Sequence, residues 1–242
     1  MKIALAQIYS DPSDLSSNVD KHKHCISLAA EHSVDMVCFP ELSLTSYYLI
    51  RDHNARRTQW QQALEDVHAH ACNLSLQSVI GIPEVKQESV FISSAILNKD
   101  GSRTSYMKQF LHDDEKPFFI AGDAKGILTA HDCKIGLAIC YESLLTEHVL
   151  PLLQENINLY LAMLAKDKKG MLAAVNHYSE LAATHKMPVA CVNAVGQADG
   201  FICAGRTTVW DENGEQLLSL SDRDEAMLIF DSNLKGVREL RI

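Results

Sequence analysis

The chain has 242 residues, of which 47% are hydrophobic, and its formal net charge is −9. A chain of this length and apolar content can bury a large core. Because it shows no linker, repeat or low-complexity segment, it predicts a single domain over residues 1–242. The acidic balance and the lack of a basic stripe argue against nucleic acid or an anionic membrane as a partner. No apolar stretch is long enough to predict a membrane span.

The seven cysteines have irregular spacing and form no C-x-x-C pair. The apolar run at residues 1–8 is too short for a signal peptide, and Gln7 interrupts it. Together these features predict reduced thiols in a cytoplasmic protein and no disulfide framework.

Two clusters of histidine and cysteine, at residues 22–25 and 68–72, fall in segments that are predicted to be helical. Residues two apart on a helix point to different sides, so neither cluster converges easily on one metal ion. We therefore expect these histidines to face solvent, with neither a metal site nor a cofactor.

Apolar runs, alternation and turn residues predict the elements along the chain. We expect strands at residues 2–8, 36–39, 78–82, 89–97, 102–107, 126–130, 133–139, 159–163, 188–192, 207–210, 216–220 and, as the last, 226–230. We expect helices at residues 19–31, at 58–72, directly after Cys140, and at 171–185. Because strands alternate with helices but hairpins are mixed in, the pattern predicts a layered α/β fold with mixed sheets.

One candidate nucleophile stands where a buried strand meets a helix. The apolar run Ile135–Ile139 ends at Cys140, and leucines at helical spacing follow it. The strand would fix the thiol, and the amides and positive dipole end of a helix would stabilise a thiolate and an oxyanion. By itself, however, this stretch favours a small apolar cysteine that ends a core strand, as most buried cysteines are.

Two further residues favour the catalytic interpretation. Glu41 follows a buried strand behind a proline, and Lys108 ends another strand. Strand ends in α/β sheets gather at one cleft, so Glu41, Lys108 and Cys140 could meet there. A carboxylate can take the thiol proton, and an ammonium can lower the thiol pKa and hold the oxyanion of a tetrahedral intermediate. These three groups suffice for acyl transfer from an amide to water through a thioester.

The same segments resemble the motifs of the nitrilase superfamily of carbon–nitrogen hydrolases. Residues 40–47 are similar to its P-E-L-x-L-T-G-Y segment, residues 106–119 to its lysine segment, and residues 136–142 to its G-x-x-I-C-Y-D/E nucleophile segment. Weaker matches continue through Asn193 and residues 205–214. The resemblance covers residues 2 to about 231 in the right order.

This resemblance implies a four-layer αββα sandwich with two mixed β-sheets, often paired as a homodimer. It implies Glu41 as general base, Lys108 as oxyanion stabiliser and Cys140 as nucleophile. It also implies Glu115 as a second carboxylate that places Lys108 and the substrate. The supporting residues in the same motifs are Tyr47, Tyr141 and Glu142.

Several positions depart from the superfamily pattern without touching the three central residues. Ser46 replaces a glycine, Phe110 stands where histidine is common, and Leu144 replaces a basic residue. Residues 162–165 lack the usual pocket aromatic. These departures bear on which substrate is accepted.

The sequence therefore predicts a cysteine-dependent amidase that acts on a small linear amide and not on peptide bonds. The alternative is a catalytically idle relative that binds a small metabolite or a partner. A cysteine–histidine hydrolase ranks last, because none of the eleven histidines stands in a supporting motif.

Overall fold

The computed structural model describes residues 1–47, 53–131, 133–198 and 200–242, without the side chains of residues 53–56. The strands are β1 (Lys2–Gln7), β2 (Met36–Cys38), β3 (Gln77–Lys86), β4 (Ser89–Leu97), β5 (Arg103–Met107), β6 (Ile127–Ala130), β7 (Cys133–Ile139), β8 (Leu159–Leu164), β9 (Val189–Asn193), β10 (Val195–Gln197), β11 (Ile202–Ala204), β12 (Thr208–Trp210), β13 (Gln216–Ser219), β14 (Ala226–Asp231) and β15 (Gly236–Arg241). The helices are α1 (Leu15–Glu31), α2 (His53–Asn73), α3 (Thr146–Leu153) and α4 (Lys168–His185), with a 3-10 helix, η2, at Cys140–Leu144.

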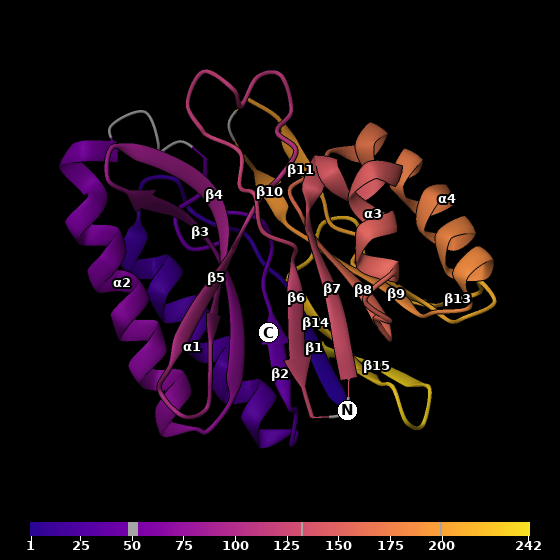
Figure 1. Ribbon diagram of the computed structural model, residues 1–242. Helices are drawn as coiled ribbons and strands as arrows, with labels where there is room; N and C mark the ends of the chain where they lie inside the picture. The colour runs from indigo at the N-terminus through magenta and orange to yellow at the C-terminus, as the bar shows by residue number, and fades with distance from the viewer. Residues whose placement is uncertain (48–52, 132, 199) are drawn as a thin grey trace.

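Two large mixed sheets lie face to face between two layers of helices (Figure 1). One sheet has the strand order β15-β14-β1-β2-β3-β4-β5, and the other has the order β13-β12-β9-β8-β7-β6. Helices α1 and α2 cover the first sheet, and α3 and α4 cover the second (Figure 1). The predicted αββα sandwich with two mixed sheets is confirmed. None of the described helices is both long and apolar enough to cross a bilayer.

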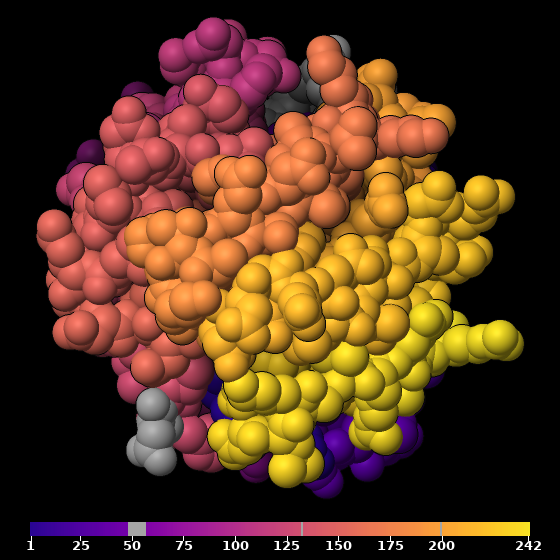
Figure 2. All heavy atoms as spheres, turned by 90° about the vertical axis from the view of Figure 1, so that its right-hand side faces the viewer, coloured from indigo at the N-terminus to yellow at the C-terminus, as the bar shows by residue number. Residues whose placement is uncertain are grey.

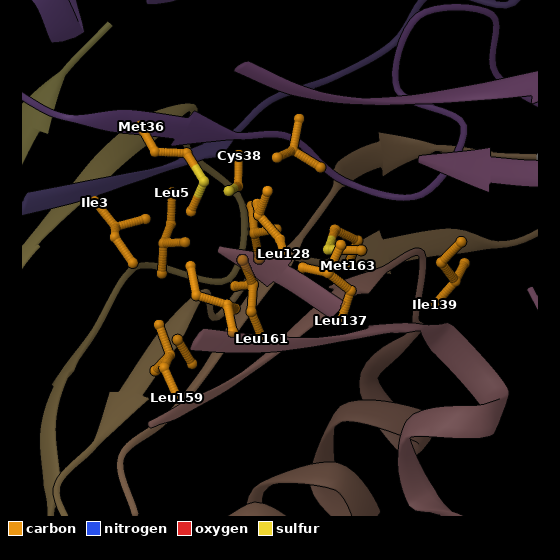
Figure 3. Packing of buried hydrophobic residues seen from close by; sticks show 14 of the residues in the cluster. Ile3, Leu5, Met36, Cys38, Leu128, Leu137, Ile139, Leu159, Leu161 and Met163 are labelled. Atoms are coloured by element: carbon orange, nitrogen blue, oxygen red, sulfur yellow. The ribbon is translucent and has the colours of Figure 1, made fainter. Parts of the chain in front are cut away.

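The strands are apolar on both faces because each sheet is buried on both faces. In β7, Ile135, Leu137 and Ile139 belong to the core between the sheets, whereas Ala138 belongs to the core under α3 and α4. The same alternation places Leu161 of β8 between the sheets. Figure 3 shows such side chains of the two sheets pointing toward one another. This central layer is held by apolar packing, and no backbone ladder joins the two sheets among the described residues.

Helices α1, α2 and α4 begin earlier in the chain than predicted. Helix α1 begins at Leu15, not at residue 19, because Asp14 caps it by accepting a hydrogen bond from the Ser17 amide. The helix expected directly after Cys140 is divided, since Leu145 has an extended backbone between η2 and α3.

Three strands were not predicted. Strands β10 and β11 form a separate short hairpin, and β15 extends the first sheet beyond the strand at residues 226–231 that was expected to be the last. The predicted hairpin of β6 and β7 is present, although Asp132 in its turn lies outside the described residues.

Candidate active site

The turn that carries Glu41 follows β2 and is held by buried polar groups of α1. The Asn18 side chain donates to the Leu44 carbonyl at 3.1 Å, and His22 Nε2 lies 3.0 Å from Ser43 Oγ. Burial lowers the pKa of His22 to about 4, so its imidazole is neutral at neutral pH. The prediction that this histidine faces solvent is therefore wrong: His22 is buried and anchors the Glu41 turn.

Backbone geometry fixes the same turn from the other side. A Cβ atom at Gly81 of β3 would lie 2.1 Å from the Pro40 carbonyl oxygen, so the close approach of β3 requires glycine there. Ser46 has a φ of 56°, a left-handed backbone conformation that favours glycine, the residue that the superfamily motif has at this position.

Lys108 lies at the end of β5 with its ammonium wholly buried between two carboxylates. Its Nζ donates to Glu41 Oε1 at 2.8 Å and to Glu115 Oε1 at 2.7 Å. Burial alone would lower the pKa of Lys108, but the charges of the adjacent carboxylates Glu41 and Glu115 outweigh it and raise that pKa well above its ordinary value. The ammonium is therefore permanently charged, and two of its three N–H donors are engaged.

Glu115 lies in the loop after β5, and a backbone amide of the same loop holds its side chain. Its second oxygen, Oε2, accepts a hydrogen bond from the His112 amide at 2.8 Å. Burial and the nearby Glu41 charge raise the pKa of Glu115, while Lys108 opposes the rise. By contrast, Glu41 Oε2 is buried without a close hydrogen-bond partner among the described residues, with the Tyr47 side chain nearby.

Cys140 stands at the end of β7, in the opposite sheet. Its φ of 50° makes a sharp turn from the strand into η2, a conformation that costs about 1 kcal/mol in a non-glycine residue. Its Sγ lies 3.9 Å from the Ala165 carbonyl oxygen.

The thiol of Cys140 is less acidic than the sequence predicted. Burial and then the Glu41 charge raise its pKa to about 11, and the opposing charges of Lys166 and Lys108 do not compensate. The expected dipole of a long helix is also absent here, because η2 has only five residues before the chain becomes extended. The resting group is therefore a neutral thiol, which would need a base to act as a nucleophile.

A cavity of about 630 Å³ opens above this cluster. Its walls include four of the predicted residues, Tyr47, Glu115, Cys140 and Tyr141. Glu41 and Lys108 lie buried behind them and contact one another directly. The remaining walls include the aromatic side chains Phe118, Phe119 and Phe201.

Lys166 also lines the cavity, next to the carbonyl that faces Cys140. Asn193 fixes its backbone, since Oδ1 accepts from the Lys166 amide at 2.8 Å and Nδ2 donates to the Lys166 carbonyl at 3.0 Å. The sequence motifs assigned this lysine no part in the site. Its place at the end of β8, beside the strand of Cys140, is the signal that could have revealed it.

The three predicted supporting residues, Tyr47, Tyr141 and Glu142, lie at different depths around the cavity. The Tyr47 hydroxyl is buried near Glu41, Cys140 and Glu115, and burial together with their charges raises its pKa. The ring of Tyr141 meets His112 edge to face, with ring centroids 5.3 Å apart. Glu142 is fully buried below the cavity and does not line it. No group of three or more His, Cys, Asp or Glu among the described residues could hold a metal ion.

Chemically, this arrangement brings together a free carboxylate oxygen, a fixed ammonium and a thiol at one cavity. The carboxylate can accept the thiol proton, and the third ammonium N–H can stabilise negative charge on a substrate oxygen.

The chain matches the sequence profile of the carbon-nitrogen hydrolase family over residues 2–242, and it belongs to that family. It is 25% identical over 252 residues to an (R)-stereoselective amidase from Pseudomonas sp, covering 100% of this chain and 88% of that protein. It is 26% identical over 226 residues to a glutamine-dependent NAD(+) synthetase from Acinetobacter baylyi, covering 88% of this chain and 41% of the synthetase.

Solved structures share the fold. An amidase double mutant from Nesterenkonia sp. AN1, in complex with acrylamide, superposes with a TM-score of 0.86 at 21% identity, covering 95% of this chain and 89% of that one. A glutamine-dependent NAD+ synthetase from Acinetobacter baumannii superposes with a TM-score of 0.85 at 23% identity, covering 100% of this chain. The chain spans 47% of that synthetase, so it matches only part of the larger enzyme.

Replacing Lys108 by methionine should destabilise the protein strongly, because two buried carboxylates lose their counter-ion. We expect a loss of about 3–5 kcal/mol at pH 8 in urea unfolding. Without the ammonium the pKa of Glu115 rises further above its unfolded value. The folded state then holds extra protons, and stability falls as pH increases from 5 to 8.

The matched control is Lys108→Met combined with Glu115→Gln, which removes one of the two carboxylates. It should recover part of the lost stability at pH 8. An equal loss at pH 5 and pH 8 in the single variant would contradict the buried charge cluster.

Proposed function

We propose that the protein is a cysteine-dependent amidase that hydrolyses a small linear amide to an acid and ammonia or an amine. The observation that carries this proposal is the buried Lys108 ammonium bonded to both Glu41 and Glu115, beside the cavity that Cys140 lines. The amidase among its relatives supports the same class of substrate.

In the first half-reaction, Glu41 Oε2 takes the Cys140 proton as the sulfur bonds to the amide carbon. The electron pair of the carbonyl moves to oxygen, where the free N–H of Lys108 and the amide after Cys140 stabilise it. When the tetrahedral intermediate collapses, the carbon–nitrogen bond breaks and Glu41 gives its proton to the leaving nitrogen. The products are a thioester on Cys140 and free ammonia or amine.

In the second half-reaction, Glu41 takes a proton from water as the water oxygen bonds to the thioester carbon. Collapse breaks the carbon–sulfur bond, releases the acid and returns the proton to the thiolate. Glu115 keeps Lys108 oriented throughout, because it shares the ammonium without being the proton carrier. No metal or cofactor enters these steps.

The first test is ammonia release across primary amides, carbamoyl amino acids, glutamine and nitriles. Glutamine belongs in the panel because two curated relatives are glutamine-dependent synthetases. We expect release from at least one small amide and none from the Cys140→Ala control. A protein that binds such compounds but turns over none of them would instead be the catalytically idle alternative.

A trapping experiment tests the role of Glu41. The Glu41→Gln variant should scarcely cleave amides, because the leaving nitrogen cannot depart unprotonated. It should still react with an activated ester, since removing the Glu41 charge also removes a cause that raises the pKa of Cys140. With no base for water, the acyl group should stay on Cys140 and appear as one added mass.

Cys140→Ala is the control and should gain no mass. Amide turnover by Glu41→Gln near the wild-type rate, or an acyl group on another residue, would show that Glu41 is not the base.

We also propose that the protein forms a homodimer, as the family resemblance implies. The outer layer of α3 and α4 exposes large apolar side chains, with Leu150 48% and Leu172 63% exposed. Figure 2 looks onto this side of the molecule, where the orange segment with α4 reaches the surface. Light scattering should give twice the chain mass of 26.9 kDa, and a constant monomer mass at all concentrations would contradict the proposal.

A further inference from the structure

The carboxylate of Glu142 is fully buried and accepts four hydrogen bonds from two segments of the chain. Its Oε1 accepts from the Tyr106 hydroxyl at 2.6 Å and from the Ile139 amide at 2.8 Å. Its Oε2 accepts from the amides of Gln109 at 2.6 Å and Phe110 at 3.1 Å. Both oxygens are therefore saturated by donors.

These donors flank the two reacting groups. Gln109 and Phe110 directly follow Lys108, and Ile139 directly precedes Cys140. Lys108 follows β5 in the seven-stranded sheet, whereas Cys140 follows β7 in the six-stranded sheet. Apolar packing between the sheets is non-directional, so it does not fix these two strand ends precisely against each other. The Glu142 carboxylate fixes the ends of β5 and β7 against each other, because it makes directional hydrogen bonds to both.

We propose that Glu142 is a positioning residue, which sets the distance and orientation of the Lys108 ammonium relative to the Cys140 thiol. The inference rests on the proposed function, because those two groups must act on one substrate carbonyl. Glu142 itself touches neither the cavity nor the substrate.

The ionised carboxylate can accept all four of these hydrogen bonds, which an amide of the same shape cannot do. Glutamine would keep the shape but present an NH₂ group to N–H or O–H donors on one side, so hydrogen bonds would be lost. Burial outweighs the hydrogen bonds and Lys108 and raises the pKa of Glu142 to about 7, so the ionised form that accepts all four bonds predominates above neutral pH.

The polar network continues away from the site. The Tyr106 hydroxyl lies 2.9 Å from His148 Nε2, and His148 Nδ1 lies 3.1 Å from the Tyr160 hydroxyl. Burial lowers the pKa of His148 to about 4, so this ring is neutral at neutral pH. Tyr160 therefore offers a matched control, because it belongs to the same buried network but does not bond to Glu142.

The test compares two reactions of Cys140 in the Glu142→Gln variant. Acylation by p-nitrophenyl acetate requires the oxyanion to meet Lys108, whereas alkylation by iodoacetamide requires the same ionised sulfur but forms no oxyanion. Since a displacement of about 1 Å can cost on the order of a hundredfold, acylation and amide kcat should fall about tenfold to a hundredfold, with alkylation and KM changed less than about threefold.

Tyr106→Phe removes one of the four donors and should give a smaller loss of the same kind. It also serves if Glu142→Gln does not fold. Tyr160→Phe should lose stability in thermal unfolding but keep the wild-type ratio of acylation to alkylation.

Wild-type acylation by Glu142→Gln and Tyr106→Phe, or an equal fall of acylation and alkylation, would overturn the positioning role. Failure of the proposed function looks different, because the wild-type protein would then release no ammonia from any amide. Acylation of Cys140 by the ester would still show whether Glu142 positions Lys108. A wild-type protein that is not acylated at all would overturn both.

Discussion

The buried ammonium of Lys108 is the constraint on which the rest of the site depends. A wholly buried charge is tolerated only with good counter-ions, and here Glu41 and Glu115 supply them at 2.8 and 2.7 Å. To deliver these carboxylates, the chain needs a tight turn after β2 and an ordered loop after β5. The buried polar groups of α1 and the glycine of β3 serve the first of these requirements, and the His112 amide serves the second.

Much of the fold could be predicted because its strands are short, apolar and bounded by turns. The strands at the centre of each sheet were placed nearly correctly, since burial on both faces leaves a clear signal. The last strand, β15, was missed because most of its residues are exposed, so they show no apolar pattern. What makes this segment a strand is its pairing with β14. The β10–β11 hairpin was missed because its strands are both short and partly exposed, so no continuous apolar run marks them.

The candidate site was predictable in its residues but not in its electrostatics. Local motifs marked Glu41, Lys108 and Cys140, yet the desolvation that raises the thiol pKa is a property of the folded environment. His22 was assigned to the surface and Lys166 was overlooked because their surroundings also arise only when distant segments pack together. The contacts of Glu142 join segments more than thirty residues apart, which no local pattern encodes.

The neutral resting thiol has a consequence for chemical damage. Peroxides and similar oxidants react with thiolates, not with thiols. A free cysteine has a pKa near 8.5, so a pKa of about 11 reduces the thiolate fraction of Cys140 at neutral pH by roughly a few hundredfold. Cys140 therefore rests in a form that resists oxidation, and under the proposed mechanism Glu41 takes its proton only as the sulfur attacks the substrate.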